Sequence, residues 1–219
     1  RLYVLPIQKD ANGKREPRKL TTANYHVEDF AWSNDGSRIA FGHVKSPVAN
    51  DWPTSDVSII EVTSGKVTAL ANTPAAESSP LYSPDGKSIA VLASDNPPRW
   101  AQAGTIQIYS ASGGQPKNLV GSFDAQPFVA GWSSDSKRIY FSEPKGTGTQ
   151  IYVLDVTANR IDEIKTTPAV ISGMNSLNVG QRNTGREDEA DLCGAVASGE
   201  LAGRALGHDA TDGDDRDPV

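Results

Sequence analysis

The sequence predicts an all-β fold built from repeated four-stranded sheets, and three observations predict it. A twelve-residue motif occurs three times, with equivalent residues 50 positions apart. Further strand patterns, separated by short turns, follow each copy of the motif. Helical periodicity is absent before residue 170.

The repeated motif runs from a strand ending in an aromatic residue, through a tight turn, into a second strand. Its copies are residues 30–41, 80–91 and 130–141. Four columns recur in all three copies: Trp32, Tyr82 and Trp132; Ser33, Ser83 and Ser133; Asp35, Asp85 and Asp135; Ile39, Ile89 and Ile139. The second strand alternates, which predicts that Ile39 and Phe41 point inward while Arg38 and Ala40 point outward.

The turn of the motif follows the pattern Ser-Pro-Asp-Gly. Serine and proline at the first two positions favour a type I turn, and glycine accepts the left-handed conformation that closes it. The aspartate carboxylate is expected to accept hydrogen bonds from backbone N–H groups of the same turn. We therefore interpret a group of turn residues as structural and not catalytic: Asp35, Gly36, Asp85, Gly86 and Asp135.

Two more strands complete each unit, a long third strand and a short fourth one. Four antiparallel strands in 40–50 residues are typical of a β-propeller blade, whereas a β-sandwich would not repeat one turn at this spacing. The sequence thus predicts a partial β-propeller of about three complete blades plus partial ones. The expected blades are residues 1–22 (the last two strands of a blade), 24–71, 74–120 and 124–166. Because a propeller closes with about four to eight blades, we expect a fragment of a larger ring.

The motif resembles the propeller blades of the prolyl oligopeptidase family of serine peptidases, especially its acylaminoacyl-peptidase and dipeptidyl-peptidase branches. A similar repeat occurs in the propeller of the Tol-Pal system. The resemblance covers residues 1 to about 176, and the long loops at 42–56 and 94–104 favour the peptidase branch. It implies a gating and substrate-positioning domain for short peptides, partnered by an α/β-hydrolase domain of the same parent chain. The alternative is a non-enzymatic binding propeller, of the Tol-Pal type or another protein-interaction type.

The chemistry of such a peptidase is missing from this sequence. No Gly-x-Ser-x-Gly nucleophile motif occurs, so we predict no catalytic residue and no activity for this chain alone. Phosphate-loop and zinc motifs are also missing, and no cofactor or metal is expected. Trp52, Trp100 and Arg99 lie in the two long loops and are the candidate contacts with a ligand or a neighbouring domain. The alternative is that each loop packs on its own blade.

The charge is distributed unevenly. The formal net charge of −6 belongs to residues 166–219, and residues 1–165 are balanced. The acidic balance argues against a nucleic-acid partner, and no apolar run is long enough to predict a membrane span. We predict a propeller at 1–176 and an acidic Gly/Ala/Asp-rich tail at 177–219. The tail is either the product of a frame shift or a genuine disordered segment. The sequence starts at Arg1 without a signal-peptide pattern, so a missing natural N-terminus is expected and localisation stays open.

Overall fold

The computed structural model describes residues 1–100 and 103–165. The predicted tail at 177–219, and the last part of the predicted propeller before it, lie outside the described residues. Within them the regular secondary structure is almost entirely strand. The elements are β1 (Tyr3–Val4), β2 (Arg18–Lys19), β3 (His26–Trp32), β4 (Arg38–Val44), η1 (Ala49–Thr54), β5 (Asp56–Glu61), β6 (Val67–Ala71), β7 (Glu77–Tyr82), β8 (Ser88–Ser94), β9 (Gly104–Ser110), β10 (Lys117–Asn118), β11 (Phe128–Trp132), β12 (Arg138–Lys145), β13 (Gly148–Asp155) and β14 (Arg160–Ile164).

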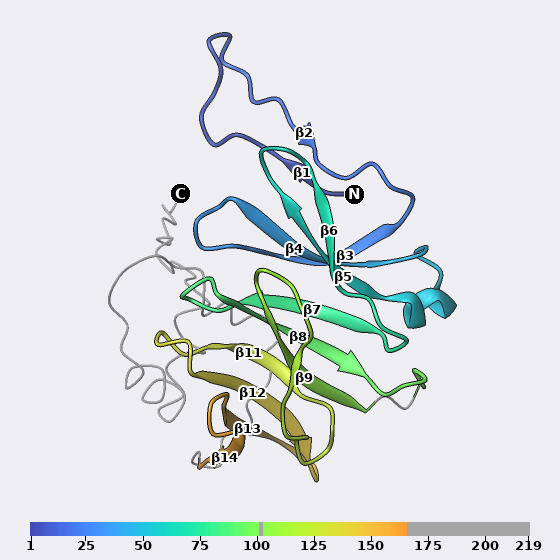
Figure 1. Ribbon diagram of the computed structural model, residues 1–219, viewed down its shortest axis with the longest axis vertical. Helices are drawn as coiled ribbons and strands as arrows, with labels where there is room; N and C mark the ends of the chain where they lie inside the picture. Colours follow the sequence, from blue (N-terminus) through green and yellow to red (C-terminus); the bar gives the residue numbers. More distant parts are fainter. Residues whose placement is uncertain (101–102, 166–219) are drawn as a thin grey trace, which may run out of the picture.

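The strands form three four-stranded sheets and one two-stranded sheet, each connected in simple sequential order. The sheets are β1-β2, β3-β4-β5-β6, β7-β8-β9-β10 and β11-β12-β13-β14, and every pairing is antiparallel. Figure 1 shows them following one another along the long axis of the molecule, from β1-β2 at the top to β11–β14 at the bottom. The predicted all-β class with four-stranded antiparallel blades is confirmed.

The loop between β4 and β5 contains a short helix that the sequence pattern did not predict. Residues Ala49–Thr54 form the 3₁₀ helix η1, with Pro53 inside it. Thr54 closes the segment, because its hydroxyl donates to the carbonyl of Asp51 and accepts a 3.0 Å hydrogen bond from the backbone of Lys45. Six residues are too few to produce a helical period in the sequence. No helix in the described ranges is long and apolar enough to cross a bilayer.

Strand β4 is buried on both faces, which corrects the prediction for Ala40. We expected Ala40 to point outward, yet its exposed fraction is 0%. It packs into a cluster with Tyr82 and Ile89 of the next sheet. Ile39 and Phe41, on the opposite face of β4, belong to a different cluster that includes residues of β1-β2 and their flanks. The alternation is real, but both faces of β4 are covered because its sheet lies between the β1-β2 sheet and the β7–β10 sheet.

The same division of faces recurs in the next two sheets. Ile89 of β8 faces the preceding sheet, whereas Ala90 belongs to the cluster shared with the following one. Ile139 and Phe141 of β12 join Ala90 in that cluster. The Ile and Phe/Val positions of the repeat therefore pack against the preceding sheet. The small side chains of Ala40 and Ala90 let the following sheet approach closely.

The three motif turns have one shared geometry. In the first, the backbone N–H of Gly36 donates to the carbonyl of Ser33 over 2.9 Å, and Gly36 has a φ of 68°. The Asp35 carboxylate accepts hydrogen bonds from the Ser33 hydroxyl at 2.6 Å and from the backbone N–H of Ser37 at 3.0 Å. Asp85 and Asp135 repeat both contacts at the same distances.

A carboxylate also connects adjacent sheets. One oxygen of Asp29 accepts a 2.9 Å hydrogen bond from the backbone of Gly42 in its own sheet, and the other accepts 2.8 Å from the backbone of Ser79 in the next sheet. A Cβ added to Gly42 would lie 2.2 Å from the Asp29 oxygen that accepts the hydrogen bond from Gly42. Position 42 therefore needs a glycine because the Asp29 side chain occupies the space that a larger residue would take.

We predict that Gly42→Ala breaks the Asp29 bridge between the two sheets. The added methyl forces the carboxylate away from both N–H donors, which should lower the free energy of unfolding by about 2 kcal/mol. Urea unfolding measures the loss, and Gly121→Ala, whose Cβ would meet open space, is the matched control. In an Asp29→Ala background the Gly42 change should cost almost nothing. Additive losses in the double variant would show that the two residues are not coupled.

A second prediction concerns acid stability. Hydrogen bonds from Ser33, and then from Ser37, lower the pKa of Asp35 to about 2. Since the unfolded value is about 3.9, the ionised carboxylate stabilises the fold fully above pH ~4, and this contribution is lost as the pH falls through the folded pKa. Asp35→Ala should therefore reduce the urea midpoint clearly at pH 7 and less as the pH approaches 2.

The control for this pH series is Asp124→Ala, because Asp124 is an exposed aspartate outside the three motif turns. An Asp35→Ala deficit that stays constant from neutral to acid pH would contradict the assigned role of the carboxylate.

Candidate functional site

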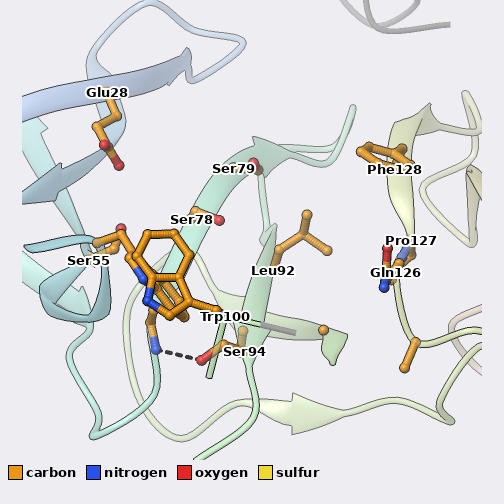
Figure 2. A pocket seen from close by; sticks show the side chains of 15 residues that line it. Glu28, Ser55, Ser78, Ser79, Leu92, Ser94, Trp100, Gln126, Pro127 and Phe128 are labelled. Atoms are coloured by element: carbon orange, nitrogen blue, oxygen red, sulfur yellow. Dashed lines mark hydrogen bonds between the residues drawn. The ribbon is translucent and has the colours of Figure 1, made fainter. Parts of the chain in front are cut away.

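A cleft of about 570 Å³ lies where the long loops of two sheets meet the start of a third. Its lining comes from all three four-stranded sheets and includes residues of β3, η1, β7, β8 and β11. Figure 2 shows Trp100 and Ser55 on one side of the cleft, Phe128 and Gln126 on the other, and Leu92 between them. The cleft spans the junctions between blades, so the fold must be assembled for it to exist.

The two loop tryptophans that the sequence singled out meet in this cleft. Trp52 extends from η1, and Trp100 from the loop between β8 and β9. Their ring centroids lie 5.5 Å apart with the planes tilted by 56°, a separation typical of attractive aromatic pairs. Trp100 remains 69% exposed. The two loops therefore contact each other across adjacent blades, so neither packs only on its own blade.

Arg99 takes a different place from the two tryptophans. It does not line the cleft. Its guanidinium pairs with the Asp95 carboxylate four residues earlier, and this bond lowers the pKa of Asp95. The pair holds the start of the loop together. The turn residues Asp35, Asp85 and Asp135 also do not line the cleft.

The inner strands supply one lining column that the sequence reasoning missed. Glu28, Ser78 and Phe128 all line the cleft, and they stand 50 residues apart in the sequence. Each lies close to a shift in register on its strand. Glu28 is itself the extra residue between Val27 and Asp29, whose partners on β4 are consecutive. The 50-residue period marked this column, but three unlike residue types gave no reason to select it.

Two buried glutamates hold the segments that lead into the cleft. Glu77 and Glu143 both have an exposed fraction of 0%. Glu77 accepts hydrogen bonds from the hydroxyl and backbone N–H of Thr73, and its backbone exchanges bonds of 2.7 and 2.8 Å with Ser55. Glu143 accepts from the Ser122 hydroxyl and from the backbone of Gln126 at 2.9 Å. Ser55 and Gln126 line the cleft, so the backbone of Glu77 and the carboxylate of Glu143 each hold one of its walls.

The surroundings of the cleft are acidic. Burial raises the pKa of Glu77 and that of Asp29, against the hydrogen bonds that favour their charged forms. Asp29 binds the backbone of Ser79, another lining residue. The lining itself contains the Glu28 carboxylate and no lysine, arginine or histidine. Among residues 1–100 and 103–165, no group of three or more His, Cys, Asp or Glu side chains is placed to hold a metal ion.

Known proteins of two kinds are similar to this chain. No protein-family model matches it. Dipeptidyl-peptidase 5 of Porphyromonas gingivalis is 29% identical over 141 residues, which are 63% of this chain and 21% of the relative. The Tol-Pal system protein TolB of Francisella tularensis subsp. mediasiatica is 34% identical over 94 residues, 43% of this chain and 20% of the relative. The chain thus spans about a fifth of the length of these curated relatives.

The arrangement of the sheets also recurs in solved structures. A puromycin-hydrolysing peptidase of Mycobacterium tuberculosis superposes with a TM-score of 0.53 at 17% identity, over 69% of this chain and 24% of that one. The fold is a β-propeller. Its resemblance to the propellers of prolyl oligopeptidase-type peptidases is confirmed, and the propeller of TolB is similar as well.

We predict that the two tryptophans of the propeller stabilise each other across the blade junction. A double-mutant cycle with Trp52→Ala and Trp100→Ala should give a coupling energy of about 0.5–1 kcal/mol in urea unfolding, because the ring pair is lost only once. The pair Trp52 and Phe123 is the control, since Phe123 is an exposed aromatic residue outside the cleft. Equal coupling for both pairs would mean that the Trp52–Trp100 contact contributes nothing specific.

Proposed function

We propose that this chain is the non-catalytic propeller portion of a serine peptidase that acts on short peptides, and that the aromatic cleft contacts the peptide. The observation that carries this proposal is the cleft itself: two tryptophans from separate long loops face a shared groove. Its exposed aromatic and neutral polar lining suits an extended peptide, which presents apolar side chains and backbone hydrogen-bonding groups together. The match to a dipeptidyl-peptidase is longer than the match to TolB, 141 residues against 94, and this supports the peptidase hypothesis.

The chemistry of the proposed parent lies in another domain. The partner of the propeller is an α/β-hydrolase domain of the same parent chain, and this domain carries the serine nucleophile. The propeller positions the peptide and restricts access to that site. No nucleic-acid partner is proposed, because the chain is acidic and its cleft has no basic lining residue.

A second function is favoured by one observation, the 34% identity to TolB, which exceeds the identity to the peptidase. In this alternative the chain is a non-enzymatic propeller that binds another protein. The two functions differ in what the gene encodes beyond these residues: a Gly-x-Ser-x-Gly hydrolase domain for the peptidase, a stop codon for the binding propeller.

We predict that the purified 219-residue chain binds short peptides and does not hydrolyse them. An N-acetylated, uncharged tripeptide amide should change the tryptophan fluorescence, and Trp100→Ala should weaken binding about threefold to tenfold through loss of an aromatic contact. Chromogenic aminoacyl anilides should remain intact. Phe123→Ala is the control variant, because Phe123 is exposed outside the cleft.

Two outcomes would contradict this proposal. Turnover of the anilide by purified material would place catalysis within the chain. If Trp100→Ala binds the peptide with unchanged affinity, the cleft is not the contact surface. The binding-propeller alternative then stands.

A further inference from the structure

The cleft contains one feature that peptide binding by itself does not require. Glu28 is exposed and is the one charged residue in the lining. Its carboxylate has no ion-pair partner within the described part of the chain. An acidic group without a partner, in the same cleft as two tryptophans, is complementary to a cation, since carboxylates attract a cation by charge and indole faces attract it by their quadrupoles.

The residues behind the lining strengthen this complementarity. Asp29 is hydrogen-bonded to the backbone of Ser79, and Glu143 to the backbone of Gln126, so both carboxylates lie directly behind cleft residues. The nearby cation Arg99 is already paired with Asp95. The potential in the cleft is therefore negative, and nothing in the lining offsets it.

The backbone fixes the position of Glu28. Glu28 is the bulged residue of β3, and its side chain lies on the exposed face of the strand, between the half-buried Val27 and Asp29. Figure 2 shows its carboxylate on the side of the cleft where Ser55 and Trp100 lie, opposite Phe128. One end of the groove thus holds the Glu28 carboxylate and Trp100, and the other holds Phe128 and the neutral Gln126.

We propose that the cleft is a subsite for a positively charged peptide side chain, lysine or arginine, held by the Glu28 carboxylate and the Trp52 and Trp100 rings. This inference rests on the proposed function, because it names the peptides that the cleft selects. The aliphatic stem of such a side chain lies along the indoles while its charged end reaches Glu28.

The test compares matched peptides on the full chain. The N-acetylated amide of Ala-Lys-Ala should bind about fivefold more tightly than the same peptide with norleucine, which keeps the stem and lacks the charge. The preference should shrink when salt is raised from about 0.01 M to about 1 M, because the Debye length falls from ~30 Å to ~3 Å. Calorimetry and tryptophan fluorescence give the affinities.

Glu28→Gln should abolish the lysine preference and leave the norleucine peptide unaffected. The matched control is Glu16→Gln, which removes the same charge from an exposed position in the β1–β2 connection. A lysine preference that survives in Glu28→Gln would overturn the proposal. So would a preference that follows a free α-amino group in place of the side chain, tested with the non-acetylated peptides.

The outcomes separate this inference from the function beneath it. Equal binding of the lysine and norleucine peptides, weakened in both cases by Trp100→Ala, would remove the cation subsite while the cleft remained a peptide contact. Absence of binding by either peptide would overturn both.

Discussion

Face-to-face packing of neighbouring sheets is the interaction on which the rest of this structure depends. Strand β4 has no solvent-facing side, because Ala40 and Phe41, on its opposite faces, are both fully buried. A repeat unit such as one blade cannot bury its apolar faces by itself. Each blade is therefore stabilised by packing against its neighbours, and the cleft, which spans blade junctions, inherits its geometry from that packing.

Polar contacts fix the spacing that the apolar clusters leave adjustable. Asp29 joins the backbones of two blades, and Asn34 donates to the Ser83 carbonyl of the next turn over 3.2 Å. The backbone of Asp85 donates to the hydroxyl of Ser136 in the blade after that. Such bonds have a strict distance and direction. They hold the strand ends in register, including those where the cleft forms.

The fold was predictable from the sequence to the degree that the repeat constrains it. The columns of Ser33, Asp35 and Ile39 recur because every blade needs the same turn and the same core contact. Ala40 was misjudged since alternation shows that a strand has two faces and does not show that a second sheet covers the outer one. The meeting of Trp52 and Trp100 was beyond prediction, because the distance between two loops is set by blade packing and not by either loop. Glu28 was missed because a bulge has no residue signature here.

The groove-facing column of the inner strands β3, β7 and β11 has a wider consequence. Glu28, Ser78 and Phe128 in this column are three unlike residues, whereas the columns of Ser33, Asp35 and Ile39 hold the same residue in every copy. A change in the groove column therefore leaves the scaffold intact. Relatives with this architecture are free to diverge in what they recognise without losing the ability to fold, and one blade-building rule can serve proteins as different as a dipeptidyl-peptidase and a Tol-Pal system protein.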